Sequence, residues 1–410
     1  MAAPRIVIVG AGIAGTALAD ELTLRGATDV TVIDRGPLWR TGGATSHAPG
    51  LVTRTSASRI MHLFADYTIS KLMNLDVDGQ PCFLPVGSIE TALTQERMDY
   101  LVRRSEFAES WGFQARIISA EQAAALHPLI DPSVLVGAFH TTNEGIGKAL
   151  RGAEAQGRRA QAAGARFIGD TAVRSITTEG DRVTGVVTDA GPIAADAVVL
   201  AAGSWGKGLA ATAGVVVPLV AMEHQYAVTE PVAALAPYRD GDASLPFVRH
   251  WEGGIYVRDE GDRAGIGSFN HRALPRTDAE MVANTTSDDP SKFPLTQPEW
   301  ELGWDATVHL MPALRDLGLA DAYNGVFPYS PDGLPIMGES PHVAGLWTLE
   351  CVWATHSVGA ARSLAQVMLG QAPDVDFAPG DLSRFDTPDL ARADFEQRCA
   401  NAYVDTYALH

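Results

Sequence analysis

The N-terminal end of the chain carries three glycines at a spacing suited to binding a diphosphate. They are Gly10, Gly12 and Gly15, in the pattern G-x-G-x-x-G. In such a turn the first glycine allows a tight bend, the second lets the backbone approach a pyrophosphate, and the third lets a helix pack closely on a strand. The free N–H groups at the start of that helix then bind the phosphates. Asp34 follows where a carboxylate binds a ribose hydroxyl, so these residues predict an adenine-dinucleotide site.

Two strands and one helix are needed to position these residues. Ile6–Val9 is a short β-branched apolar run, typical of a strand buried on both faces, and Val30–Ile33 is a second one that ends at Asp34. Between them, Ile13–Arg25 has apolar residues at helical spacing. A glycine-rich turn alone also occurs for packing reasons. Strand, turn, helix, strand and terminal acid in this order favour the dinucleotide.

Shortly after Asp34, the small residues from Ala44 to Gly50 surround one imidazole, that of His47. A segment of such small residues can lie flat against a planar ring system without steric conflict. On composition alone, however, His47 is more often an ordinary hydrogen-bonding loop residue than a reactive one.

The first 50 residues resemble the flavin domain of the dimethylglycine oxidase and dimethylglycine/sarcosine dehydrogenase family, within the D-amino-acid-oxidase-like flavoproteins. The resemblance rests on the glycine turn and on Thr45-Ser46-His47-Ala48-Pro49-Gly50. In that family the histidine of this segment is joined covalently to the 8α-methyl group of FAD. The resemblance therefore implies FAD as the cofactor, attached through His47.

Further segments resemble the family in the same order. Tyr323–Gly338 resembles its Thr/Ser-Pro-Asp-Gly-x-Pro-x-x-Gly stretch, which would form a rigid corner beside the flavin. The helix expected at Val358–Leu369 would point its N-terminus at the flavin and stabilise negative charge on the reduced ring. The FAD contacts that the resemblance implies are Gly10, Gly12, Ile13, Ala14, Gly15, Asp34, Arg35, Ala44, Thr45, Ser46, His47, Leu51, Val173, Gly203, Tyr256, Val352, Trp353, Ala354 and Thr355.

His224 and Tyr256 are implied as catalytic residues. Each lies in a segment with strand alternation, where a histidine or tyrosine usually packs inside the core. In the family, the histidine of a His-Gln-Tyr strand and the tyrosine of the next hairpin line the substrate pocket, and both contexts match. His224 would accept a hydrogen bond or proton, and Tyr256 would orient the substrate. For a substrate carboxylate we expect Arg258 or Arg249, although surface ion pairing is the commoner role of such arginines.

The reaction that the resemblance implies is oxidative demethylation of an N-methyl amino acid similar to dimethylglycine or sarcosine. Hydride would pass from the carbon next to nitrogen to flavin N5, and hydrolysis of the iminium ion would give the demethylated amine and formaldehyde. Oxygen or an electron-transferring flavoprotein would reoxidise the cofactor. Because the family's usual protein continues into a folate-binding half, we also consider a separate folate-binding subunit as a partner.

Two other functions stay open. One is glycine or D-amino-acid oxidation, which would release ammonia. The other is a flavin-carrying electron-transfer subunit with no substrate turnover of its own. A nicotinamide dehydrogenase is disfavoured because flavin-type segments at 10–15, 44–51 and 325–338 occur in the order that the family shows.

Composition limits the partners. The 410 residues carry a net charge of −18, which argues against nucleic acid and anionic membranes as partners and means that a carboxylate substrate needs a local arginine. The three cysteines, Cys82, Cys351 and Cys399, are far apart and suggest neither a disulfide framework nor a metal site. We find no targeting segment and no apolar run long enough for a bilayer, and therefore expect a cytoplasmic protein.

The order of elements predicts an α/β fold (α+β overall). We expect a Rossmann-like FAD-binding domain of the glutathione-reductase type from residues 1–79, 145–217 and 325–375. A smaller antiparallel-sheet substrate domain would comprise residues 80–144 and 218–324. The polar stretch 277–300 is expected to be a long loop, and 376–410 an extension that packs on the surface.

Overall fold

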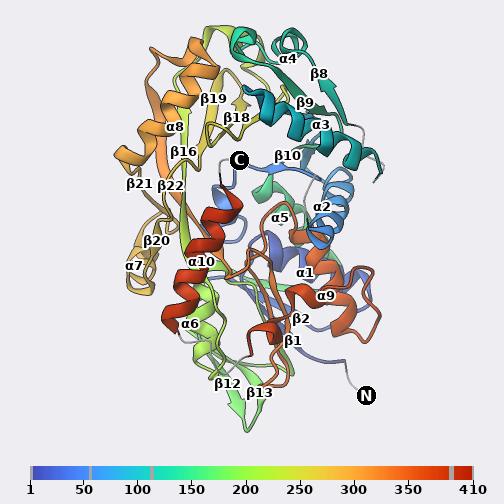
Figure 1. Cartoon of the computed structure of the whole chain (residues 1–410). Coiled ribbons are helices and arrows are strands. Elements are labelled where there is room, and N and C mark those ends of the chain that lie inside the picture. Colours follow the sequence, from blue (N-terminus) through green and yellow to red (C-terminus); the bar gives the residue numbers. More distant parts are fainter. Residues whose placement is uncertain (1–2, 55–57, 111–114, 387–391, 409–410) are drawn as a thin grey trace.

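The computed structural model describes residues 3–54, 58–110, 115–386 and 392–408. It places a mainly parallel sheet with its helices at one end of the molecule and a larger antiparallel sheet at the other (Figure 1). The α/β fold class expected from the sequence is confirmed. Within the described ranges, no helix combines the length and apolarity needed to cross a membrane.

The first sheet is built from short apolar runs in the order β11-β2-β1-β15-β24-β23. Neighbours from β11 to β24 are parallel, and β23 is antiparallel to β24. Successive residues of β1 enter different cores, because strand side chains alternate between faces: Ile6 and Ile8 join one, Val7 and Val9 the other. The strands are β1 (Ile6–Val9), β2 (Val30–Ile33), β11 (Arg166–Ile168), β15 (Ala197–Leu200), β23 (Ile336–Glu339) and β24 (Leu346–Glu350).

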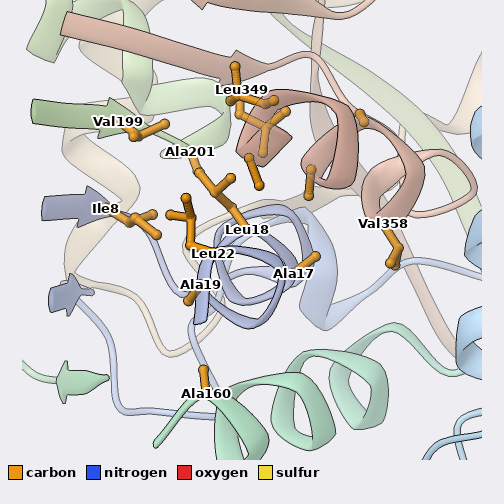
Figure 2. Close-up of a cluster of buried hydrophobic side chains, with 14 of the residues drawn as sticks. Ile8, Ala17, Leu18, Ala19, Leu22, Ala160, Val199, Ala201, Leu349 and Val358 are labelled. Carbon is orange, nitrogen blue, oxygen red and sulfur yellow. The ribbon is translucent and has the colours of Figure 1, made fainter. Parts of the chain in front are cut away.

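Helix α1 packs on one face of this sheet, between α5 and α9. Figure 2 shows Ile8, Val199 and Leu349 of the strands facing Leu18 and Leu22 of α1. The other face carries a three-stranded meander and a short helix, whose apolar side chains complete the second core. The elements of these two layers are α1 (Ile13–Leu24), α5 (Ala149–Ala162), α9 (Ser357–Met368), β12 (Val173–Glu179), β13 (Arg182–Thr188), β14 (Gly191–Ala194) and α6 (Gly206–Ala211).

The antiparallel sheet has the order β21-β22-β16-β19-β18-β17-β7-β9-β8, with β20 paired to β16 and with β17 parallel to β7. Its register places Gly325 opposite His224 and Arg249 opposite Tyr256. Strand β22 passes residue 325, where we expected a domain boundary, and stays in this sheet. The strands are β7 (Ser88–Ala92), β8 (Ala115–Ile118), β9 (Gly137–Thr141), β16 (Val220–Thr229), β17 (Phe247–His250), β18 (Ile255–Glu260), β19 (Arg263–Ser268), β20 (Pro275–Arg276), β21 (Lys292–Pro294) and β22 (Leu319–Tyr329).

Helices and short strands complete the chain. Trp300 and Leu310 of α8 join Val257 and Ile266 of the antiparallel sheet in a third core. The remaining elements are α2 (Arg59–Leu72), α3 (Gln95–Ser110), α4 (Ala120–Leu126), α7 (Asp278–Ala283), α8 (Gln297–Leu310), α10 (Arg392–Thr406), β3 (Leu51–Val52), β4 (Asp76–Val77), β5 (Gln80–Pro81), β6 (Phe83–Leu84) and β10 (Gly145–Gly147).

The prediction that 277–300 is a long loop is wrong. The segment contains α7, β21 and the start of α8. Thr277 begins α7 with a capping box: its hydroxyl accepts a hydrogen bond from the Glu280 amide, and the Glu280 carboxylate accepts one from the Thr277 amide. Pro298 lies in the first turn of α8, where a missing N–H costs nothing. The polar residues that suggested a loop are those that cap α7 or lie in the first turns of α7 and α8.

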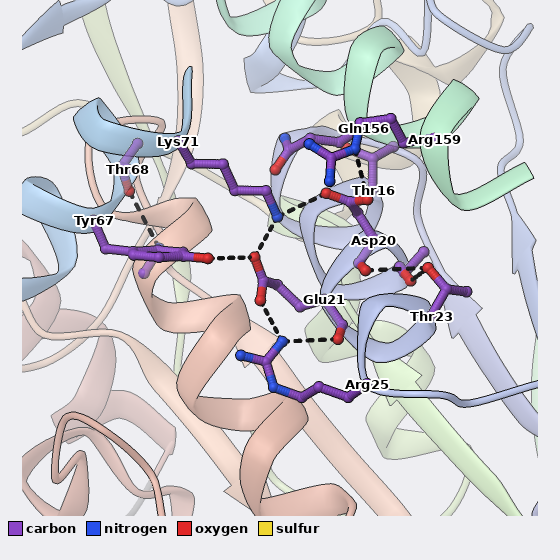
Figure 3. Close-up of polar contacts among 12 residues, drawn as sticks. Thr16, Asp20, Glu21, Thr23, Arg25, Tyr67, Thr68, Lys71, Gln156 and Arg159 are labelled. Atoms are coloured by element: carbon purple, nitrogen blue, oxygen red, sulfur yellow. Dashed lines mark hydrogen bonds and ion pairs between the residues drawn. The ribbon is translucent and has the colours of Figure 1, made fainter. Parts of the chain in front are cut away.

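A buried ion network joins α1 to α2 (Figure 3). Lys71 contacts Asp20 at 2.7 Å and also Glu21, and these side chains are 8%, 2% and 1% exposed. Tyr67 donates a hydrogen bond to Glu21 at 3.0 Å, and Arg25 pairs with it at 2.5 Å. Burial disfavours the Glu21 carboxylate, but Lys71 and Arg25 outweigh this effect and lower its pKa below the ordinary 4.5. The resulting stabilisation is present above pH 4.5 and is lost as the pH falls through the lowered pKa.

We expect Lys71→Met to lower the free energy of unfolding by about 3 kcal/mol at pH 7, because two buried carboxylates lose the cation that they share and keep only Arg25 and Arg159 as partners. Urea unfolding followed by circular dichroism measures this change. Arg158→Met is the matched control, since Arg158 pairs with Asp78 at 3.0 Å on the surface, and it should leave stability nearly unchanged. Equal effects of the two substitutions would contradict the expectation.

Candidate functional site

The first cavity of the site lies where the parallel strands end. It holds about 380 Å³, and its wall combines the β1–α1 turn, the end of β2, the turn after β15 and the end of β24. Gly10 has a φ of +113°, and a Cβ there would lie 2.2 Å from the Ala201 carbonyl oxygen. Gly12 precedes α1 and has no side chain to cap it, while Thr45 Oγ1 accepts a hydrogen bond from the Ile13 amide at 3.1 Å, and all three residues line the cavity. The turn therefore has the shape of a phosphate cradle.

Asp34 holds the glycine turn in place. Its two carboxylate oxygens accept hydrogen bonds from the backbone amides of Ala11 at 2.7 Å and Gly36 at 2.8 Å. Burial raises the pKa of Asp34 to about 6. Its neighbour Arg35 stacks over the ring of Trp205 at 4.4 Å. Both Asp34 and Arg35 line the first cavity, at the position expected for an adenosine.

Glu350 is a cavity residue that the sequence reasoning missed. It is 1% exposed, it lines the first cavity, and its Oε1 accepts a hydrogen bond from the Ala202 amide at 2.8 Å. Burial raises the pKa of Glu350 to about 8, although the backbone amides of Ala202 and Gly203 act to lower it. A signal existed, because Leu346–Glu350 is an apolar strand that ends at an acid, as does the strand before Asp34. Glu350 thus fixes the turn after β15 from inside the protein.

A second cavity adjoins the first and reaches the antiparallel sheet. It holds about 280 Å³ and shares Ile13, Ala44, Thr45, Pro328 and Val352 with the first one. The two together bring most of the predicted residues to one continuous wall. Those that line at least one cavity are Gly10, Gly12, Ile13, Ala14, Asp34, Arg35, Ala44, Thr45, His47, Leu51, Val173, Gly203, His224, Arg249, Tyr256, Val352, Trp353, Ala354 and Thr355.

Three predicted residues line neither cavity. Gly15 packs on the turn itself, where a Cβ would lie 1.9 Å from the Gly10 carbonyl oxygen. The Ser46 hydroxyl donates to the Gly43 carbonyl at 2.7 Å and closes the short turn before His47. Arg258 lies in β18, and its guanidinium contacts Glu260 and Tyr226 instead of either cavity.

His47 lines the second cavity, and its Nε2 is buried without a hydrogen-bond partner among the described residues. Burial, reinforced by the positive charge of Lys292, lowers its pKa to about 4, so the ring is neutral. Its ring passes so close to Gly325 that a Cβ there would lie 2.6 Å from Nδ1. The ring of His47 therefore brings a neutral imidazole to the wall of the second cavity.

His224 and Tyr256 lie on the opposite sheet and stack on each other, with ring centroids 5.7 Å apart and planes 9° from parallel. Burial, with smaller effects of His271 and His47, lowers the pKa of His224 to about 3, and burial raises that of Tyr256 well above 10. Both rings are therefore neutral at pH 7.

The structure distinguishes the two candidate arginines. Arg249 lines the second cavity, and its guanidinium lies 4.5 Å from the centre of the Trp251 ring. Arg258 instead pairs with Glu260 at 2.7 Å and donates to the Tyr226 hydroxyl at 3.2 Å. The described residues give Arg249 no ion pair within 4 Å, and the carboxylates of Glu90 and Glu144 act on its charge only from a greater distance.

The C-terminal helix enters the site, contrary to the expected surface packing of 376–410. Tyr403 is fully buried, and Tyr407 lines the second cavity against Phe269 at 5.1 Å between centroids. The signal in the sequence is a stripe four residues apart, Phe395, Cys399, Tyr403 and Tyr407, of which the first three form the buried face of α10 and Tyr407 follows its last residue.

Comparison with known proteins places the chain among flavoproteins. The profile of the family described as FAD dependent oxidoreductase (DAO) matches residues 5–367. The chain is 29% identical over 419 residues to 4-methylaminobutanoate oxidase (formaldehyde-forming) of Paenarthrobacter nicotinovorans, covering 99% of this chain and 48% of that protein. It is 26% identical over 424 residues to mitochondrial sarcosine dehydrogenase of Homo sapiens, covering 98% and 44%. The chain thus spans about half the length of these relatives.

Among solved structures, L-proline dehydrogenase from P. horikoshii superimposes with a TM-score of 0.79 at 20% identity, over 93% of this chain and 98% of that one, a likeness of fold. The resemblance seen in the sequence is confirmed, and the family match includes the glycine turn, His47 and most of α9. The chain belongs to the FAD dependent oxidoreductase (DAO) family.

Proposed function

We propose that the two adjoining cavities bind FAD, with its diphosphate at the glycine turn and its ring system beside His47, to which it is covalently joined. The fit rests on two features of this chain. A side chain at Gly10 would fill the cradle, and His47 Nε2 is a buried nitrogen that lacks a partner among the described residues. The remaining space between His47 and the antiparallel sheet then becomes the substrate pocket.

We further propose that the substrate is an N-methyl amino acid of the dimethylglycine or sarcosine type, which is oxidatively demethylated. The observation that carries this proposal is the wall of the second cavity, where aromatic rings surround a single arginine, Arg249. Arg249 binds the carboxylate, and the apolar rings disfavour a charged ammonium and so favour the free amine. His224 accepts the proton that the ammonium loses as it becomes the free amine, and Tyr256 orients that amine.

Bound FAD supplies the acceptor for the hydride that leaves the carbon next to nitrogen, after which water converts the iminium ion to formaldehyde and the demethylated amine. The relatives support this proposal by their names, a formaldehyde-forming oxidase of a methylamino acid and a sarcosine dehydrogenase. We extend it to a cytoplasmic enzyme reoxidised by oxygen or an electron-transferring flavoprotein, with a separate folate-binding subunit as a candidate receiver of the one-carbon unit.

Anaerobic mixing with a panel of amines tests the proposal. Dimethylglycine, sarcosine and 4-methylaminobutanoate are added to the oxidised holoprotein, and glycine and D-alanine serve as primary amines. We expect at least one N-methyl compound to bleach the flavin absorbance and to yield one formaldehyde per flavin. Ammonia from the primary amines would indicate deamination instead, and no bleaching by any amine would favour an electron-transfer subunit.

A further inference from the structure

Helix α10 inserts the hydroxyl of Tyr403 between two histidines of the antiparallel-sheet half. The hydroxyl oxygen lies 3.1 Å from His224 Nδ1 and 3.3 Å from His271 Nε2. At the far end, His271 Nδ1 lies 2.7 Å from the Arg272 carbonyl oxygen. These four groups form one hydrogen-bonded chain that ends at the wall of the second cavity, which His224 lines. Tyr403 lies beyond the residues 5–367 that the family profile matches.

The direction of every hydrogen bond in this chain follows from the Arg272 carbonyl. A carbonyl only accepts, so His271 carries its proton on Nδ1, and in the neutral ring Nε2 is an acceptor. Burial lowers the pKa of His271 and so favours the neutral ring, against the opposite effect of the Arg272 and Ser268 carbonyls. The Tyr403 hydroxyl therefore donates to His271, and its oxygen accepts from the Nδ1–H of His224. The second nitrogen of His224, Nε2, has no hydrogen-bond partner within the described part of the chain, so its lone pair is free.

We propose that Tyr403 and His271 are positioning residues, which hold His224 as the Nδ1–H tautomer so that Nε2 is the proton acceptor in the substrate cavity. The role given to His224 rests on the function proposed above. In the step concerned, the N–H bond of the bound ammonium breaks and an Nε2–H bond forms on His224, which leaves the free amine with its lone pair. No proton has to travel along the chain, because the Nδ1–H bond to Tyr403 persists and strengthens as the ring becomes charged.

The packing of α10 keeps the Tyr403 hydroxyl in register with His224. Tyr403 is fully buried with Val220, Met222 and Phe395 in one apolar cluster. In the same cluster, the ring of Tyr329 lies 5.5 Å from that of Tyr403, and the Tyr329 hydroxyl donates to Thr406 Oγ1 at 2.5 Å. Tyr329 thus touches the same helix through the same kind of group without touching His224, which makes it a matched control.

The direct test reads the His224 tautomer by nitrogen NMR in holoprotein labelled with ¹⁵N-histidine. The wild type should show one neutral tautomer with the proton on Nδ1. In His271→Leu, Tyr403 loses its acceptor and donates to His224 instead, so the proton should move to Nε2. In Tyr403→Phe, the preference should disappear and both tautomers should be populated. Tyr329→Phe should leave the wild-type signals unchanged.

Stopped-flow reduction of the flavin by substrate gives the second readout. Tyr403→Phe and His271→Leu should slow the reduction rate constant by roughly tenfold to a hundredfold with little change in the half-saturating substrate concentration. Tyr329→Phe should leave both values unchanged. A wild-type proton on His224 Nε2, or wild-type tautomers in both variants, overturns the inference. If no amine reduces the wild type, the proposed function fails, while the NMR result still decides the tautomer.

Discussion

Denatured His47→Ala protein is expected to carry no FAD, whereas the denatured wild-type chain is expected to carry one. The reason is geometric, since the neutral His47 ring lines the second cavity with a nitrogen that lacks a partner among the described residues. Folded His47→Ala protein should still bind FAD reversibly, because the glycine turn and Asp34 do not depend on the imidazole. Intact-mass measurement in acid, together with the visible spectrum of the folded protein, separates the two properties.

His356 provides the matched control for this experiment. It also lines the second cavity, its Nδ1 is buried and unpartnered within the described ranges, and burial lowers its pKa to about 3. His356→Ala should keep the added mass, as should His224→Ala. Loss of the mass in His356→Ala but not in His47→Ala would move the attachment to His356. A wild-type chain without added mass would exclude any covalent bond.

The fold and the nucleotide end of the site could be predicted because local sequence determines them. Ile6–Val9 and Val30–Ile33 are buried on both faces and therefore consist of continuous apolar residues. Gly10 is required by a backbone approach that no other residue allows. Asp34 terminates the second of these strands, so its place at the edge of the sheet follows from its place in the chain.

The amine end could be predicted only in part, because it is assembled by long-range pairing. His224 and Tyr403 are 179 residues apart, and no local pattern connects a strand to the C-terminal helix that contacts it. Arg249 and Arg258 both lie near Tyr256 in the sheet. Only the folded structure shows that Arg258 is already bound by Glu260 and the Tyr226 hydroxyl.

Arg249→Gln is expected to lower kcat/KM for N-methyl amino acids by roughly a hundredfold, mainly through a higher KM. A buried carboxylate that loses its charged partner forfeits about 3 kcal/mol, and each 1.4 kcal/mol corresponds to about a factor of ten. Arg249 is half-buried, and burial lowers its pKa, so its charge is partly removed from water. Steady-state kinetics with dimethylglycine or sarcosine measures the effect.

Two controls distinguish carboxylate binding from damage to the fold. An N-methyl amine without a carboxylate should react equally slowly with the wild type and with Arg249→Gln, because it has no group that Arg249 could bind. Arg258→Gln should instead lower the midpoint of thermal unfolding, since it leaves Glu260 without its cation in a largely buried site. If Arg258→Gln raised KM selectively while Arg249→Gln did not, the carboxylate would bind at Arg258, and the wall of the second cavity would have to rearrange around the substrate.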